Sequence, residues 1–267
     1  MSEETLRELA HREISESLYL SNFCMHRIGL SFESKKSFFS YVWQKVLFAL
    51  SFASICYHVF SEITYISITL VNSPRVEEVV PLLHTFGYGL LSIAKVLAIW
   101  YKLDVFAKLL TELVDIWPVP PLDPVCQKIK DNSLSGLRTA HRWYFVCNVA
   151  GVWFYNLTPL GIYFYRLWQQ KQAEVGFVWV SWYPFNKHHP VAHVFVYLFE
   201  MFAGQTCVWI MVCSDLLFTA MASHISMLLR ILQLRLHTLG VTSDDHYRNL
   251  IDNVKLHQRL IRHVKKN

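Results

Sequence analysis

The chain has 267 residues, of which 53% are apolar and only 17% are charged. Soluble domains carry about 25% charged residues, so this composition argues against a soluble protein and fits burial in lipid. The net charge of +5 does not indicate a nucleic-acid partner, because the basic residues are scattered and interleaved with acids. The six cysteines form no CxxC pair, and we expect no disulfide framework, no bound metal and no cofactor.

The amino-terminal segment, residues 1–45, is polar and mixed in charge. We expect short amphipathic helices on the inner face of a membrane, with a solvated arm as the alternative. No cleavable signal peptide is visible, so the amino terminus is predicted to stay in the cytoplasm.

Residues 46–101 contain the first and second predicted spans, joined by a short outer loop. The second span is expected to begin at Pro81, since proline suits a first helical turn. Glu62 and Lys95 lie at similar depths below the shared loop. They predict either a membrane-buried ion pair or a lysine that snorkels toward the inner surface.

Residues 102–142 are predicted to be a cytoplasmic helical loop. Leucines at helical spacing extend the second helix until prolines between 118 and 124 break it, and a polar helix then leads back to the membrane. Residues 143–190 hold the third span and an outer loop. In that span, Pro159 can kink the helix and free a carbonyl for a ligand or a neighbour.

Residues 191–236 are predicted to form one long fourth helix. About 20 residues cross a hydrocarbon core of about 30 Å, so the rest is expected to project as an amphipathic stalk. Arg230 and Arg235 place that end in the cytoplasm. Residues 237–267 are predicted to be a cytoplasmic helix leading to a missing fifth span. Because the chain stops there without an exit signal, we expect a truncated gene product or isoform.

The distribution of lysine and arginine sets the predicted orientation, because these residues concentrate in the segments assigned to the cytoplasm. The fold class that follows is all-α. We predict a polytopic membrane helix bundle with four spans and long cytoplasmic helix extensions. We expect it in the plasma membrane, as a multi-pass protein with the amino terminus inside.

The clearest signal for metal chemistry is a histidine cluster, His188, His189 and His193, which has the spacing of a histidine box. A membrane di-iron enzyme needs several such boxes on one face, and the other histidines are scattered. No phosphate-binding glycine loop or nucleophile elbow is present. We therefore expect no enzyme, with a di-iron enzyme kept as a minor alternative.

Binding is the remaining interpretation. The outer halves of the second, third and fourth spans are rich in aromatic side chains, and such a bundle can enclose a small apolar ligand. The alternative is that these side chains only pack helix on helix or face lipid. The candidate ligand-binding residues are His84, Tyr88, Tyr155, Pro159, Tyr163, Tyr197 and Met201.

Several short motifs, in order along the chain, resemble those of the insect odorant receptor family. The segment Trp182–Asn186 is similar to the family's Trp-x-Pro-Phe-Asp loop, with Asn186 where an acid is usual. Gln205, Asp215 and His224 follow in the family's order. His257–Ile261 resembles the element ahead of the family's fifth span.

This resemblance implies a seven-span receptor subunit, of which this chain reaches the first four. It implies recognition of a volatile apolar odorant in a pocket in the outer half of the bundle. It also implies a lipid bilayer as environment and a ligand-gated cation channel assembled with a shared co-receptor. A gustatory-type receptor or another polytopic transporter is the alternative from a different class.

Overall fold

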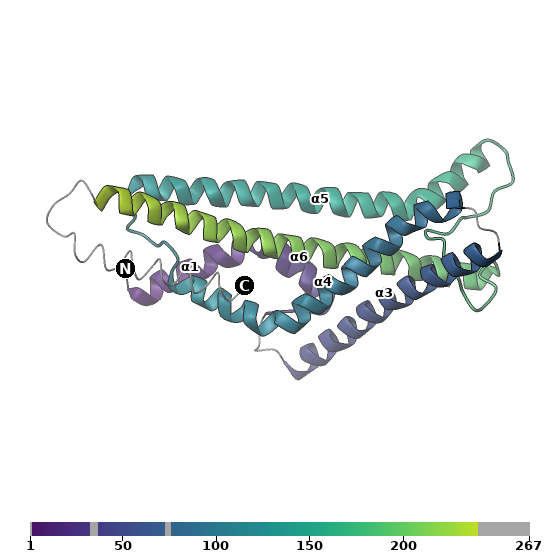
Figure 1. The fold of residues 1–267 in the computed structure, drawn as a ribbon, viewed down its shortest axis with the longest axis horizontal. Helices are drawn as coiled ribbons and strands as arrows, with labels where there is room; N and C mark the ends of the chain where they lie inside the picture. Colours follow the sequence, from purple (N-terminus) through teal and green to yellow (C-terminus); the bar gives the residue numbers. More distant parts are fainter. Residues whose placement is uncertain (1, 33–36, 73–75, 240–267) are drawn as a thin grey trace. The chain divides into compact units, whose positions relative to one another are not determined.

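The computed structural model describes residues 2–32, 37–72 and 76–239. Within these ranges the chain forms helices and no strand: α1 (Glu3–Ser17), α2 (Tyr19–Arg27), α3 (Phe38–Asn72), α4 (Val76–Asp115), α5 (Pro124–Trp168) and α6 (Pro190–Leu239) (Figure 1). Four of them, α3 to α6, are long and apolar enough to cross a membrane. The predicted all-α bundle with four spanning helices is therefore confirmed.

Helix boundaries follow ordinary local signals. The Ser2 side chain accepts a hydrogen bond from the Thr5 backbone N–H and caps α1. Asp123 does the same for α5, where its carboxylate accepts from the Val125 N–H at 3.0 Å and Pro124 fills the first position. The link between α4 and α5 contains Pro118, Pro120 and Pro121, which cannot continue a helix.

Two boundaries differ from the predictions. Helix α4 begins at Val76, so Pro81 lies in its second turn and not at its start. The polar helix after the prolines and the third span are one element, α5, which also continues through Pro159. Apolarity marks where a helix can enter lipid, but it does not mark where the helix itself begins. The predictions for residues 240–267 lie outside the described residues.

The chain divides into two compact units. The first comprises Met1–Ser21, Lys102–Trp143 and Asp215–Asn267. In its described part, a buried polar network joins α1 to the α4–α5 link. Lys130 donates to the Pro118 carbonyl at 2.8 Å and pairs with Glu13 at 2.6 Å, and the Trp117 indole also donates to Glu13. The buried lysine is thus paired with a partly buried carboxylate, which is the condition for burial of its charge to be tolerated.

The second unit comprises Asn22–Tyr101 and Tyr144–Ser214. Here the chain turns at a glycine two residues after α2: Gly29 has φ +77°, and a Cβ at that position would lie 2.3 Å from the Gln44 carbonyl oxygen. Helices α3 and α4 also approach closely, since a Cβ on Gly89 would lie 2.7 Å from the Val59 side chain. Glycine at each contact permits this close packing.

The loop between α5 and α6 is hydrogen-bonded to α3. The Trp182 N–H donates to the Ser61 carbonyl at 3.4 Å, and the Ser61 hydroxyl donates back to the Trp182 carbonyl. Asn186 shapes the turn into α6, because its side-chain oxygen accepts from the His188 N–H at 3.0 Å. The segment Trp182–Asn186 thus holds the loop against α3 and shapes the start of α6.

Candidate functional site

The second unit contains a cavity of about 360 Å³. Pockets for small molecules span roughly 300–1,000 Å³ and are mostly apolar with a few polar groups. This one fits that description, because its wall is aromatic, aliphatic and glycine-rich. The lining residues are His58, His84, Thr85, Tyr88, Gly89, Cys147, Asn148, Gly151, Val152, Tyr155, Trp179, Gly204, Cys207 and Val208.

Small residues create the open space. A Cβ placed on Gly151 of α5 would have no heavy atom within 4 Å, so this backbone borders open space. Gly204 of α6 has the opposite environment, since a Cβ there would lie 3.0 Å from the Trp179 ring. The glycine lets the indole approach α6 closely, and the indole forms part of the cavity wall.

Trp179 is held in place by Glu200, a fully buried residue of α6. The Glu200 carboxylate accepts hydrogen bonds from the Val178 N–H at 2.9 Å and the Trp179 N–H at 3.0 Å. It also accepts from the Tyr183 hydroxyl at 3.1 Å, and the Trp179 indole donates to the Glu200 carbonyl at 3.1 Å. Burial, and after it the nearby Glu200 charge, raises the pKa of the Tyr183 phenol, which therefore remains a donor.

The indole contacts two other wall residues. Its ring centroid lies 4.8 Å from that of Tyr155 on α5 and 4.9 Å from that of His58 on α3. Aromatic pairs at this separation attract each other beyond their burial alone. One loop residue thus joins α3, α5 and α6 around the cavity.

A second carboxylate, Glu62 of α3, lies one helical turn from His58. The His58 Nε2 is 3.7 Å from a Glu62 oxygen, and both side chains are buried. Neither oxygen of Glu62 has a hydrogen-bond partner. The structure therefore places Glu62 beside His58 of its own helix. The two alternatives for Lys95, an ion pair with Glu62 or a snorkelling side chain, stay predictions.

The structure brings three of the predicted ligand-binding residues together, because His84, Tyr88 and Tyr155 all line the cavity. Four others lie outside the lining: Pro159, Tyr163, Tyr197 and Met201.

Tyr197 and Met201 contact Asn156 behind the wall. The Tyr197 hydroxyl donates to the Asn156 carbonyl at 2.6 Å, and the Asn156 amide donates to the Met201 carbonyl at 3.5 Å. Tyr163 packs against Phe164 with ring centroids 5.4 Å apart. Pro159 lies close to Gly176 of the loop between α5 and α6, 3.8 Å from a Cβ placed there.

Sequence reasoning did not place His58 or Trp179 in the site. Neither residue is among the seven predicted to contact a ligand. The one signal that could have linked them is the isolated acid Glu200 at mid-helix, which needs donors when buried.

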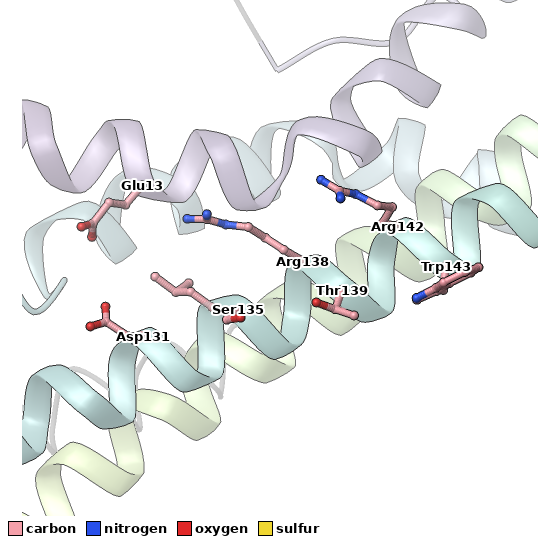
Figure 2. Close-up of a pocket in the computed structure, with 8 residues that line it drawn as sticks. Glu13, Asp131, Ser135, Arg138, Thr139, Arg142 and Trp143 are labelled. Atoms are coloured by element: carbon pink, nitrogen blue, oxygen red, sulfur yellow. The ribbon is translucent and has the colours of Figure 1, made fainter.

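A second cavity, of about 560 Å³, lies in the first unit and is polar (Figure 2). Figure 2 shows Glu13 on one side of it and Asp131, Arg138 and Arg142 on the other. Most of these charged groups already have a partner: Glu13 pairs with Lys130, Arg138 pairs with Glu16 at 3.6 Å, and Asp131 accepts a hydrogen bond from Gln127 at 2.9 Å. Most charged groups of this wall are thus already engaged within the protein. The apolar cavity is therefore the stronger candidate for a ligand site.

The histidine cluster lies at the start of α6. The His193 ring bonds to the Val175 carbonyl at 2.8 Å and packs on Phe177, 4.5 Å between centroids. Within the described part of the chain, no group of three or more His, Cys, Asp or Glu side chains could hold a metal ion. The contacts of His193 are therefore those of a packing residue.

Comparisons with known proteins agree on one family. The family described as 7tm Odorant receptor matches residues 75–266. Odorant receptor 85c of Drosophila melanogaster is 23% identical over 227 residues, which cover 83% of this chain and 57% of that protein.

Solved structures of the olfactory receptor OR5 from Machilis hrabei share the fold. The eugenol complex superposes with a TM-score of 0.67 at 16% identity, covering 98% of this chain and 64% of the receptor. A second structure of the same receptor superposes with a TM-score of 0.68 at 13% identity, covering 97% of this chain and 65% of the receptor. The chain thus spans less than two thirds of each of these relatives.

Proposed function

The chain belongs to the 7tm odorant receptor family, and on that premise we propose that it is an odorant receptor subunit that binds a small volatile apolar molecule in the cavity of its second unit. The family is one of receptors and not of enzymes. The helices long enough to span a bilayer and the family together make the chain a multi-pass membrane protein.

The observation that carries this proposal is the cavity itself. Its volume of about 360 Å³ and its aromatic wall suit recognition by shape and dispersion. Eugenol, which the Machilis hrabei receptor holds in its solved complex, is a molecule of this kind. The fixed position of Trp179 supports the proposal, because a preorganised wall costs little entropy on binding.

We assign direct ligand contact to His84, Tyr88 and Tyr155, which line the cavity. Tyr197 and Met201 act from behind the wall, by holding Asn156. Pro159 and Tyr163 lie farther along α5 and contribute to its packing rather than to the ligand.

Gating and assembly extend the proposal. The subunit would join a co-receptor in the plasma membrane to form a ligand-gated cation channel, with its amino terminus and residues 102–142 in the cytoplasm. A ligand gates such a channel only if it binds the open state better than the closed one. Residues 166–190 would then face outward, and epitope tags at the amino terminus and in that loop should report opposite sides of an intact cell.

Isothermal titration calorimetry on the purified chain in lipid nanodiscs tests the binding step, with eugenol as the probe. Gly151→Phe should abolish heat release, because the new side chain occupies open space at the cavity wall. Gly161→Phe is the matched control: it also borders open space on α5 but lies outside the lining, so binding should persist. Equal binding by both variants would show that the ligand does not bind in this cavity.

Current recordings test the channel step separately. Cells expressing the chain with a co-receptor should show odorant-evoked current above that of the co-receptor alone. If binding is measured by calorimetry but no such current appears, the channel assignment fails and the binding assignment stands.

A further inference from the structure

The buried carboxylate of Glu62 points to a ligand feature that the apolar wall does not specify. We propose that His58 and Glu62 form a polar end of the cavity, and that the cavity selects small apolar molecules carrying one hydrogen-bond-donating head group, such as a hydroxyl. This inference rests on the proposed function, because it assumes that the cavity binds a small molecule.

Glu62 is the less satisfied of two buried acids in the same unit. Its side chain is 1% exposed, and neither oxygen has a hydrogen-bond partner. His58 does not supply one, because 3.7 Å is an ion-pair distance but too long for a hydrogen bond. A buried acceptor without a donor is costly, so a site that keeps one calls for a physical explanation.

Glu200 shows that this fold can satisfy a buried carboxylate. Two backbone N–H groups and the Tyr183 hydroxyl donate to it. Glu62 has no equivalent set, although it lies in the same unit. Burial of the carboxylate alone therefore does not account for the missing donors at Glu62.

The protein's own donors around the cavity are engaged elsewhere. Thr85 donates to the Leu82 carbonyl at 3.0 Å, and the Asn148 amide donates to the Tyr144 carbonyl at 2.8 Å. The Trp179 indole donates to the Glu200 carbonyl. The Thr85 hydroxyl also lies near Glu62, but its one proton is committed to Leu82, so an occupant can supply the donor that this end of the cavity lacks.

The geometry gives such an occupant one orientation. His58 lines the cavity and contacts Trp179, and its Nε2 lies 3.7 Å from a Glu62 oxygen. A hydroxyl directed at His58 meets a ring whose other neighbour is a carboxylate, and an acceptor polarised in this way binds a donor more strongly. The apolar body of the ligand would then lie against Tyr88 and Tyr155.

The test compares 4-methylphenol with 4-methylanisole, which differ by methylation of one hydroxyl. Binding of each is measured by calorimetry on the purified chain in nanodiscs. The unmodified chain should bind the phenol roughly tenfold more tightly, as expected for one hydrogen bond to a charged or polarised acceptor. Glu62→Leu should reduce the preference to near unity, and Glu62→Gln should leave an intermediate preference.

Val208→Ala is the matched control, because Val208 lines the cavity without a polar group. This variant should weaken the binding of both molecules alike and leave the ratio of their affinities unchanged. Folding of Glu62→Leu is checked by thermal melting, where removal of an unsatisfied buried carboxylate should preserve or raise the midpoint.

The outcomes separate the two proposals. Equal binding of phenol and ether by the unmodified chain, or an unchanged preference in Glu62→Leu, would overturn this inference and leave the proposed function intact. Failure of both molecules to bind would contradict the proposed function and this inference with it. Loss of folding in Glu62→Leu would assign the carboxylate a structural role and overturn the inference as well.

Discussion

The ammonium of Lys130 on α5 lies 2.6 Å from a carboxylate oxygen of Glu13 on α1, and only 2% of the lysine side chain is exposed. The Pro118 carbonyl accepts a second hydrogen bond from the same ammonium, and the Trp117 indole donates to the same carboxylate. Within the first unit, this cluster fixes α1 against the α4–α5 link. Residues 1–45 thus include a packed helix rather than only a solvated arm.

Replacement of Lys130 by Met should destabilise the protein by about 3 kcal/mol, because it leaves the Glu13 carboxylate without its cation. The control is Arg138→Gln, since Arg138 and its partner Glu16 are each 53% exposed. Exposed pairs contribute about 0–1 kcal/mol, so that variant should melt near the unmodified protein. Thermal unfolding in detergent measures both, and equal shifts would show that burial of the Lys130 pair has no energetic consequence.

Replacement of Glu200 by Leu should make the loop between α5 and α6 more mobile. Val178, Trp179 and Tyr183 would lose the carboxylate that accepts their hydrogen bonds. Limited trypsin digestion reports this, because Lys187 lies in the loop and is held by the Ser181 carbonyl at 2.9 Å. We expect faster cleavage at Lys187 and weaker ligand binding. Glu174→Leu changes an exposed acid in the same loop and should alter neither.

Tyr183 should make stability depend on alkaline pH. Burial raises the pKa of its phenol in the folded state, whereas an unfolded tyrosine titrates near about pH 10. The stabilising effect of the neutral phenol is therefore complete below about pH 10 and is lost as the pH rises toward the folded-state pKa.

Melting midpoints between about pH 8 and pH 11 should thus fall more steeply for the unmodified chain than for Tyr183→Phe. Tyr165→Phe, an exposed tyrosine, serves as the control and should follow the unmodified chain. Parallel curves for all three proteins would show that Tyr183 does not govern this transition.

Two glycine-to-alanine changes should have opposite effects. Gly29→Ala forces a side chain into positive φ and against the Gln44 backbone, so it should destabilise by more than about 1 kcal/mol. Gly87→Ala lies within α4, where a Cβ meets nothing within 4 Å, and should stabilise by about 0.5–1 kcal/mol. The melting midpoints of the two variants test this prediction. A shift of the same sign in both would refute this account of Gly29.

The four spanning helices were predictable because each needs only a long apolar run, a local property of the chain. The start of α4 was misplaced because proline is tolerated in early helical turns as well as at the first position. Equal depth predicted either a Glu62–Lys95 ion pair or a snorkelling lysine, and it gave no sign that His58, one turn away, lies beside Glu62.

The cavity was only partly predictable. His84, Tyr88 and Tyr155 were selected because aromatic and polar side chains cluster in the outer halves of the helices. Trp179 was not selected, because its position depends on hydrogen bonds to Glu200, more than 20 residues away along the chain. Contacts between a loop and a distant helix leave no periodic pattern in the sequence.

The attachment of Trp179 to Glu200 also has a mechanical meaning. Its indole is fastened to the main chain of α6 on one side and presses on Tyr155 and His58 on the other. An occupant that displaced the ring would therefore strain the hydrogen bond between the indole and the α6 main chain at Glu200. The same contact transmits motion in the opposite direction. A shift of α6 at that turn would move the indole and change the shape of the cavity.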